Sequence, residues 1–241
     1  MKKIIALVAA LCMLLVSVSA MGDTLTMGTN AFFPPYEYYE GNEIVGIDAE
    51  IAAAIAEKLG MDLVIENMEF GAIITAITTG KVDIGMAGMT VTEDRLQSVN
   101  FSSTYATGVQ AIIVKEDSEI ADVDGLAGHT IGVQESTTGD IYCSDEFGDE
   151  SVAKFKTGND AVIALVTDKV DCVVIDIEPA KAYVAANEGL KVLDTPYAEE
   201  EYAIAMALDN TELLEKVNAA LDELIADGTV AGILAKYISA D

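Results

Sequence analysis

The feature that most constrains the fold is a regular alternation of short apolar strands with amphipathic helices. In the N-terminal part, strands are predicted at 24–28, 62–65 and 82–86, and helices at 48–59 and 72–79. The first helix carries apolar residues at every fourth position, which are Ile47, Ile51, Ile55 and Leu59. Asp48 is its predicted N-cap and Gly60 its stop signal, while Pro34 and Pro35 predict an extended loop at 30–36. Strands that alternate with helices form parallel sheets covered on both faces, so the sequence predicts a doubly wound α/β fold.

The same alternation starts again near Val109. Strands are predicted at 110–115, 130–133, 152–155, 170–175, 190–193 and 202–208, and helices at 124–127, after Asp140, at 160–167, from Pro179, at 211–227 and up to Tyr237. In the helix at 160–167, the residues predicted to face the core are Val162, Ile163 and Val166. No Gly/Ser/Pro-rich linker separates the two α/β units. We therefore expect two lobes that share a cleft, which is a favoured place for a ligand.

The first twenty residues are interpreted as a secretory signal that is cleaved after Ala20. A lysine pair precedes an apolar run at 4–16, which is shorter than the roughly 20 residues that a membrane-spanning helix needs. A retained N-terminal anchor is one alternative. Lipidation at Cys12 is a weaker one, because Leu11 stands where a lipid attachment site needs a small residue. The protein is expected in the periplasm or on the outer face of the cytoplasmic membrane.

The rest of the chain is globular in composition and strongly acidic. Half of the sequence (51%) is hydrophobic, and the net charge of −28 becomes −30 when Lys2 and Lys3 are removed. Such a surface repels nucleic acid and anionic lipid, so neither is an expected partner, and we expect a monomer. Cys143 and Cys172 would remain after cleavage; either a disulfide or two reduced thiols is compatible with an exported protein.

No catalytic or metal-binding motif stands out. The chain has no P-loop, Gly-x-Gly-x-x-Gly, Cys-x-x-Cys or Gly-x-Ser-x-Gly motif. The only histidine, His129, has no acidic neighbour fixed by the sequence and is interpreted as a solvated turn residue. A histidine-based triad and a multi-histidine metal site are therefore excluded, and no cofactor is expected.

The only arginine in the chain is Arg95, among twelve lysines and forty-one carboxylates. A guanidinium is always charged and matches a carboxylate with two parallel hydrogen bonds. Arg95 is predicted in the first turn of a helix capped by Thr92, where a cation opposes the helix dipole. Gly88 and Thr90 precede it at the C-terminal end of a strand, which is where open α/β sheets bind ligands. The segment at 136–139 holds the equivalent place in the second unit, so both segments are candidates for binding an anion.

Several segments of the chain, in order, resemble the polar amino acid solute-binding proteins of bacterial ABC importers. They are Gly46-Ile-Asp-Ala-Glu-Ile-Ala-Ala-Ala-Ile-Ala-Glu-Lys-Leu-Gly, Gly80-Lys-Val-Asp, Ala87-Gly-Met-Thr-Val-Thr-Glu-Asp-Arg, Ser136-Thr-Thr-Gly, Val170-Asp-Cys-Val-Val-Ile-Asp and Glu223-Leu-Ile-Ala-Asp-Gly-Thr. The resemblance covers essentially the whole mature chain. It implies two α/β lobes of the type II periplasmic-binding-protein kind, joined by two hinge strands that close on a free amino acid. The hinges are expected near 107–110 and 200–203, with lobe 1 at 21–108 and 201–241 and lobe 2 inserted at 109–200.

The resemblance also implies which residues contact the ligand. Arg95 would bind the α-carboxylate with help from Thr90, Gly88 would offer its carbonyl to the ammonium, and Asp176 would supply the countercharge. Phe33 and Phe70 would enclose the ligand side chain. The full implied set is Asn30, Phe33, Phe70, Gly88, Met89, Thr90, Arg95, Gln134, Thr138, Gly139 and Asp176.

Some positions depart from the pattern of the family. Relatives that take basic amino acids often have an acid at the position of Asn30, so Asn30 favours a neutral polar ligand side chain. Ser136 stands where glycine is commoner, and one extra residue lies between Asp176 and Pro179. Selectivity is expected to come from Asn30, the two phenylalanines and the loop at 134–138.

Three functions remain open from the sequence. The first is an exported binding protein that delivers a polar L-amino acid to an ABC permease. The second is an enzyme related to dehydratases of cyclic carboxylates, which would also use Arg95 but needs a positioned acid or base in the cleft. The third is a sensory domain, which would be joined to a membrane or signalling segment.

Overall fold

A computed structural model describes residues 23–238 of the chain. The predicted secretory signal lies outside this range. Within the range, no helix has both the length and the apolar character that a membrane span requires.

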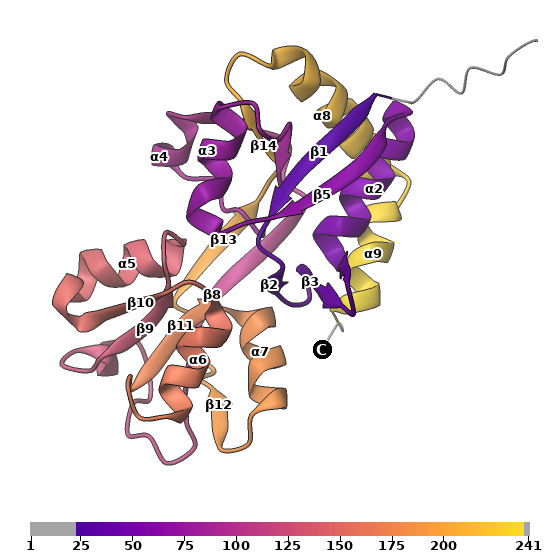
Figure 1. Cartoon of the computed structure of the whole chain (residues 1–241). Coiled ribbons are helices and arrows are strands. Elements are labelled where there is room, and N and C mark those ends of the chain that lie inside the picture. The colour runs from indigo at the N-terminus through magenta and orange to yellow at the C-terminus, as the bar shows by residue number, and fades with distance from the viewer. Residues whose placement is uncertain (1–22, 239–241) are drawn as a thin grey trace, which may run out of the picture.

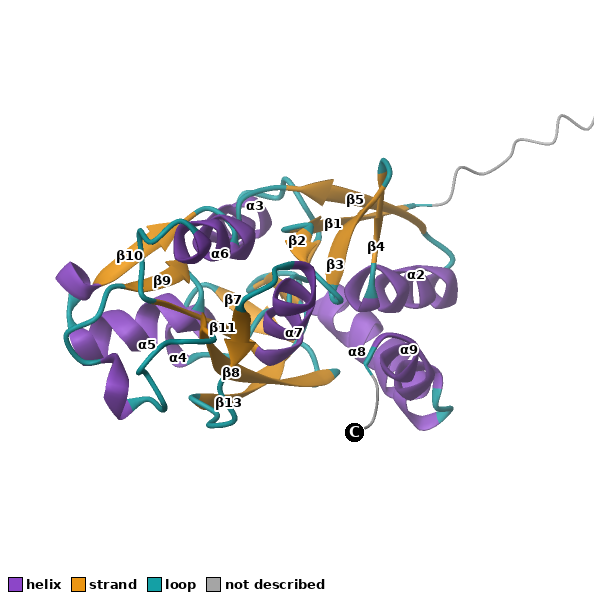
Figure 2. Ribbon diagram, turned by 90° about the horizontal axis from the view of Figure 1, so that it is seen from below, coloured by secondary structure: helices purple, strands orange, loops and turns teal. Residues whose placement is uncertain are grey.

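The first lobe is built on a five-stranded sheet in the order β5-β1-β6-β14-β7 (Figure 1). Its strands are β1 (Thr24–Thr29), β5 (Asp62–Asn67), β6 (Ile84–Gly85), β7 (Val99–Phe101) and β14 (Ala205–Ala207). The helices of this lobe are α2 (Ile47–Leu59), α3 (Ile73–Thr78), α4 (Glu93–Leu96), α8 (Thr211–Ala226) and α9 (Thr229–Tyr237). Adjacent residues of β14 point to opposite faces, so Met206 packs in the core with α2, α8 and α9, and Ala205 packs in the core with α3. Helices therefore cover both faces of the sheet, and α8 and α9 lie beside α2 (Figure 2).

The second lobe repeats this arrangement on a six-stranded sheet, β10-β9-β11-β8-β12, in which β13 also pairs with β8. Its strands are β8 (Ala106–Lys115), β9 (Ile131–Gln134), β10 (Val152–Phe155), β11 (Cys172–Asp176), β12 (Leu190–Val192) and β13 (Ala198–Tyr202). Its helices are α5 (Thr138–Phe147), α6 (Gly158–Val166) and α7 (Ile177–Ala186). On β11, Val173 and Ile175 pack in the core with α6 and α7, and Cys172 and Val174 pack with Cys143 of α5. Both sheets are mixed, because β14 in one and β8 in the other run antiparallel to their neighbours.

Two antiparallel strands run between the lobes. β8 and β13 pair with Gly108 opposite Glu200. At one end of this ribbon Tyr202 forms a bridge with Thr90 of the first lobe, and along its other end β8 pairs with β11 of the second lobe. The ribbon therefore crosses the space between the lobes (Figure 1).

The segment after β1 is more ordered than the two prolines suggest. A three-stranded antiparallel sheet forms from β2 (Phe32–Phe33), β3 (Glu37–Glu40) and β4 (Glu43–Val45). The predicted cap of α2 is wrong, because Gly46 holds the N-cap position and Asp48 lies inside the first turn. Gly46 has a φ of 124°, and a Cβ there would lie 2.3 Å from the carbonyl oxygen of Tyr36. Asp48 instead accepts hydrogen bonds from the Gly88 amide at 2.9 Å and the Tyr105 hydroxyl at 3.0 Å.

Two predictions about the second half are also wrong in detail. In α6, Val162 is buried as expected, but Ile163 and Val166 are 50% and 45% exposed, because the small Ala161 and Ala164 face the core instead. The strand predicted at 202–208 is interrupted after Tyr202, where the chain leaves one sheet and enters the other.

The histidine and cysteines also have definite surroundings. His129 has an acidic neighbour that the sequence did not reveal, since its Nδ1 lies 3.4 Å from Asp171. Cys143 and Cys172 are buried in the same core as free thiols.

Candidate functional site

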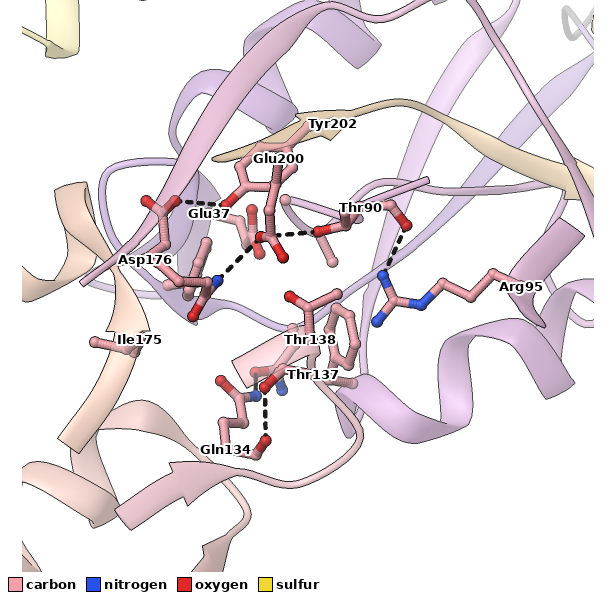
Figure 3. A pocket seen from close by; sticks show the side chains of 16 residues that line it. Glu37, Thr90, Arg95, Gln134, Thr137, Thr138, Ile175, Asp176, Glu200 and Tyr202 are labelled. Carbon is pink, nitrogen blue, oxygen red and sulfur yellow. Dashed lines mark hydrogen bonds between the residues drawn. The ribbon is translucent and has the colours of Figure 1, made fainter. Parts of the chain in front are cut away.

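A cavity with about 420 Å³ of empty space, part of which is open to solvent, lies between the two lobes (Figure 3). The first lobe, the second lobe and the crossing strands all contribute to its wall. The lining residues are Asn30, Phe33, Glu37, Phe70, Ala87, Gly88, Thr90, Arg95, Gln110, Gln134, Thr137, Thr138, Ile175, Asp176, Glu200 and Tyr202.

Arg95 brings a buried positive charge to one side of the cavity. It belongs to α4, and its side chain packs over the ring of Phe70 with 5.2 Å from Cζ to the ring centre. Nη1 donates to the carbonyl oxygen of Thr90 at 2.8 Å, and Nη2 donates to that of Ser136 at 3.2 Å. A guanidinium has five N–H donors, so three of them remain for a ligand. Within the described part of the chain, no carboxylate comes within 4.0 Å of this guanidinium.

The helix-dipole argument for Arg95 does not hold. The Thr92 hydroxyl does cap the helix by accepting from the Arg95 amide at 3.2 Å. Arg95 is in the first turn as predicted, but α4 has only four residues, so this turn is also its last. A single turn has almost no macrodipole, so the position of Arg95 is set by its contacts with Phe70 and the Thr90 carbonyl.

Glu200 and Thr90 lie next to Arg95 in a line of hydrogen bonds. The Thr90 hydroxyl donates to Glu200 Oε2 at 3.1 Å, and Gln110 Nε2 donates to the same oxygen at 3.0 Å. Glu200 is 5% exposed, and its Oε1 has no hydrogen-bond donor among the described residues. Burial lowers the pKa of Arg95, and the Glu200 charge opposes that shift.

Asp176 lies on the opposite side of the cavity from Arg95 (Figure 3) and is anchored by the protein itself. Its Oδ2 accepts from the Tyr202 hydroxyl at 2.7 Å and the Val109 amide at 2.9 Å, and its Oδ1 accepts from the Glu178 amide at 3.1 Å. Burial raises the pKa of Asp176 to about 6, although these hydrogen bonds act in the opposite direction. Asp176 thus ties β11 and α7 to both crossing strands.

Gln134 and Asn30 close the cavity from the two lobes. Gln134 Nε2 donates to Asn30 Oδ1 at 2.9 Å, and Asn30 Nδ2 donates to the carbonyl oxygen of Met68 at 2.7 Å. Next to Gln134, Ser136 has a φ of +68°, a left-handed conformation that favours glycine. The amide of Ser136 donates to Asp140 Oδ2 at 2.9 Å, which helps to hold this turn before α5.

Glu37 and Asp48 form a buried acidic pair behind the cavity. Neither oxygen of Glu37 has a donor among the described residues, and Asp48 Oδ1 is in the same situation. Burial, followed by the charge of Asp48, raises the pKa of Glu37 well above its usual range. Burial also raises the pKa of Asp48, to about 6, while hydrogen bonds from Gly88 and Tyr105 act in the opposite direction. A proton shared between Glu37 and Asp48 would give one Glu37 oxygen and Asp48 Oδ1 a hydrogen bond, and the raised pKa of Glu37 favours the neutral acid in the wall.

The structure brings most of the sequence-predicted residues to this cavity. Nine of the implied set line it, namely Asn30, Phe33, Phe70, Gly88, Thr90, Arg95, Gln134, Thr138 and Asp176. Met89 instead packs in the first-lobe core with α3, and Gly139 lies behind the wall, where a Cβ would be 2.9 Å from Gln110 Oε1. Thr137 lies in the loop that was expected to contact the ligand, and the lining residues that sequence reasoning missed are Glu37, Ala87, Gln110, Ile175, Glu200 and Tyr202. Three of them, Gln110, Glu200 and Tyr202, lie in the hinge segments predicted at 107–110 and 200–203. Alternate residues of a strand point to the same face, so this alternation could have identified them from the sequence.

The lobes are closed over the cavity. Besides the Arg95–Ser136 and Gln134–Asn30 contacts, the Tyr183 hydroxyl donates to the carbonyl oxygen of Phe32 at 2.6 Å. At the rim, Lys156 Nζ lies 2.9 Å from Glu69 Oε2.

Comparison with known proteins places this geometry among binding proteins for amino acids. The family model of bacterial extracellular solute-binding proteins, family 3, matches residues 25–240. The arginine-binding extracellular protein ArtP of Bacillus subtilis (strain 168) is 36% identical over 227 residues, which cover 90% of this chain and 87% of ArtP. The L-arginine-binding protein of Pseudomonas aeruginosa is 30% identical, with 100% of this chain and 98% of that protein covered.

Solved structures with a similar fold are also binding proteins for amino acids. An ancestral arginine-binding protein bound to glutamine superposes with a TM-score of 0.86 at 39% identity, covering 91% of this chain and 100% of its own. The arginine-, lysine-, histidine-binding protein ArtJ of Geobacillus stearothermophilus has a TM-score of 0.86 at 32% identity, covering 91% and 96%.

Proposed function

Because the chain belongs to the bacterial extracellular solute-binding proteins of family 3, we propose that it captures a polar L-amino acid in the cavity between its lobes and delivers it to an ABC permease. The observation that carries this proposal is the buried Arg95, which lines the cavity between the lobes and uses two of its five N–H donors on protein carbonyls. A cavity between two lobes is a favoured site for a small ligand. A buried charge needs a partner, and an α-carboxylate of the ligand provides it.

The charges around the cavity favour a ligand with a cationic side chain. Arg95 contributes one positive charge, Asp176 and Glu200 contribute two negative charges, and Glu37 is neutral through its shared proton. A zwitterion would leave one negative charge unbalanced in a buried space, which is costly. An amino acid that carries one additional positive charge balances it. The names of the relatives, which bind arginine, point to the same class.

Arginine is therefore the first candidate and glutamine the second. Glutamine is supported by Asn30, a neutral residue at a position where an acid is expected for basic ligands, and by the ancestral protein that was solved with glutamine bound. Gln110 Oε1 and Glu200 Oε1 lack donors among the described residues, which fits either ligand but fits a guanidinium better.

Calorimetry against the twenty amino acids and cystine tests the proposal. We expect binding in the micromolar range or tighter to one or a few ligands, with arginine tighter than glutamine. No binding to any member of the panel would overturn the assignment. Recovery of the ligand unchanged after long incubation with the protein is expected as well, and conversion of the ligand would favour an enzyme.

The proposal includes the place of action and the partner. We propose that the protein works outside the cytoplasmic membrane as a monomer. Fractionation of cells that express the full-length chain tests the location. Uptake of labelled arginine in a strain that lacks the gene tests the link to a permease, because uptake should fall and should be restored by the intact gene.

A further inference from the structure

We infer that Ser136 positions the guanidinium of Arg95 from the second lobe when the lobes close, and that Gly71 supplies the space that this contact needs. The inference rests on the proposed function, because it concerns how Arg95 is prepared for the carboxylate of a ligand. Ser136 is not among the residues that line the cavity between the lobes. Together with Gly71 it lines a second hollow at the rim, next to the Lys156–Glu69 ion pair.

The two carbonyl oxygens that hold the Arg95 guanidinium belong to different lobes. Nη1 donates to the carbonyl oxygen of Thr90 in the first lobe at 2.8 Å (Figure 3), and Nη2 donates to that of Ser136 in the second lobe at 3.2 Å. A planar guanidinium can pivot about a single hydrogen bond, whereas two bonds from different nitrogens fix the direction of the fork. The fork of Arg95 is therefore fixed in this way only when the lobes are closed.

The turn that carries Ser136 is held within the second lobe. Ser136 has a φ of +68°, a left-handed conformation that costs free energy in a residue with a side chain. Its amide donates to Asp140 Oδ2 at 2.9 Å, and Asp140 is 6% exposed. The other oxygen, Oδ1, accepts from the Ser144 hydroxyl at 3.1 Å and lies 2.9 Å from Lys154 Nζ. The direction of the Ser136 carbonyl is thus set by contacts that do not involve the first lobe.

The first lobe meets this turn at Gly71, where a side chain does not fit. A Cβ on Gly71 would lie 2.8 Å from Ser136 Oγ and 3.2 Å from Ser136 Cβ. The hydroxyl can turn away but the Cβ cannot, so an added methyl would hold the two segments apart by a few tenths of an ångström. Phe70, the residue before Gly71, packs its ring against the Arg95 guanidinium, so this shift falls on the hydrogen bond from Arg95 to Ser136. At 3.2 Å, that bond is already at the long end of the usual range.

A double-mutant cycle of Gly71→Ala and Ser136→Gly tests the inference. Gly71 has no positive φ, so alanine suits its backbone and tests the space alone. Ser136→Gly keeps the carbonyl and suits the left-handed turn, and it removes both atoms that the new methyl would meet. Calorimetry gives the dissociation constants of L-arginine and L-argininamide, or of L-glutamine and its α-amide if glutamine binds more tightly. Gly232→Ala is the matched control, because it adds a methyl in α9 with nothing within 4 Å.

Gly71→Ala should weaken binding of the amino acid by about fivefold or more, as an overpacked contact does. In the Ser136→Gly background the same substitution should change the affinity by less than about twofold, because the two Ser136 atoms are the ones that the methyl meets. Gly71→Ala should also reduce the preference for the amino acid over its amide, which lacks the carboxylate charge. A general loss of stability does not change that preference. Gly232→Ala should change neither constant, and thermal unfolding checks that each variant is folded.

Two kinds of result contradict the proposals in different ways. If Gly71→Ala binds like the wild type, loses the same factor in both backgrounds or keeps the full preference over the amide, this inference is wrong and the proposed function stands. If the wild type binds neither arginine, glutamine nor any other amino acid, the proposed function is wrong and this inference falls with it.

Discussion

The two ends of the cavity differ in how completely the protein satisfies their polar groups. At the Arg95 end, two guanidinium donors are held by backbone carbonyls and the charge packs over the Phe70 ring. At the opposite, acidic end, both oxygens of Asp176 accept hydrogen bonds from the protein. Glu200, which Thr90 links to Arg95, has a buried Oε1 with no donor among the described residues, and so has Gln110 at its own Oε1. The Arg95 end therefore keeps spare donors, and the spare acceptors lie on Glu200 and Gln110 rather than on Asp176.

Because of this difference, the two ends of the cavity contribute differently to the affinity for amino acids in general and to the choice among them. Every amino acid has an α-carboxylate, so the Arg95 end recognises the whole class and cannot choose among its members. The choice depends on the acidic end and on the Asn30–Gln134 contact, where charge and hydrogen-bond donors on the side chain matter. Substitutions at the Arg95 end should weaken all ligands together, and substitutions at the acidic end should change their ranking.

The largest expected effect is at the Arg95 end. Arg95→Lys keeps the charge but loses the planar fork, the contact with the Phe70 ring and at least one of the two carbonyl contacts. We expect binding of every ligand in the panel to weaken by about 2 kcal/mol or more. Calorimetry measures the loss, and thermal unfolding checks that the variant is folded. Unchanged affinity, or a loss confined to one amino acid, would contradict the assigned role.

The next effect tests the acidic end without changing any charge. In Gly108→Ala, the new Cβ would lie 2.2 Å from the Tyr202 hydroxyl and 2.6 Å from Asp176 Oδ2, so this hydrogen bond must be displaced. We expect the free energy of unfolding to fall by about 1–3 kcal/mol, as for other overpacked sites. Denaturant unfolding measures the change.

Gly232→Ala in α9 is the matched control for this variant. Nothing lies within 4 Å of the added Cβ, and the residue is in a helix, so this variant should be more stable than the wild type by about 0.5–1 kcal/mol. An equal effect of both alanines would show that the Tyr202–Asp176 contact does not depend on the space at Gly108.

The same contrast explains what the sequence could predict. Arg95 was identified because it is the only arginine and follows the end of a strand, and both signals are visible in the sequence. Glu200 was missed because it is one of three successive glutamates among forty-one acids. Only the pairing of β13 with β8 decides that Glu200 is buried and that Glu199 and Glu201 are exposed. Periodicity predicted most of the elements well, but it failed in part of α6, where Ala161 and Ala164 pack in the core beside Val162 and Leu165 and the larger Ile163 and Val166 face solvent.

A smaller effect is expected for the acidic pair behind the cavity. A carboxyl whose pKa is higher in the folded chain binds its proton more tightly there, so the free energy of unfolding falls as the pH rises from the unfolded pKa to the folded one. For Asp48 this window runs from about 4, the ordinary value, to about 6. Glu37, with a pKa raised well above its usual range, extends the decline to higher pH.

Glu37→Gln tests this explanation. The amide supplies a permanent donor to Asp48 in place of the shared proton, so the variant should lose less stability between about pH 5 and pH 8. At the upper end it should melt a few degrees higher than the wild type. Thermal unfolding across this range measures both slopes. A parallel or steeper decline in the variant would show that Glu37 and Asp48 do not share a proton.

The smallest effect is expected for the ion pair at the rim of the cavity. Its size shows whether closure of the lobes depends on contacts inside the cavity or on surface charge. Lys156 links the lobes through Glu69 at 2.9 Å, but the two side chains are 60% and 64% exposed. Exposed ion pairs contribute about 0.2–1 kcal/mol and are screened by salt. Lys156→Gln should therefore change ligand affinity by less than about fivefold, and the difference should vanish at high ionic strength. If the loss instead approached that of Arg95→Lys, closure would depend on surface charge, and the contrast between the two ends of the cavity would account for little of the affinity.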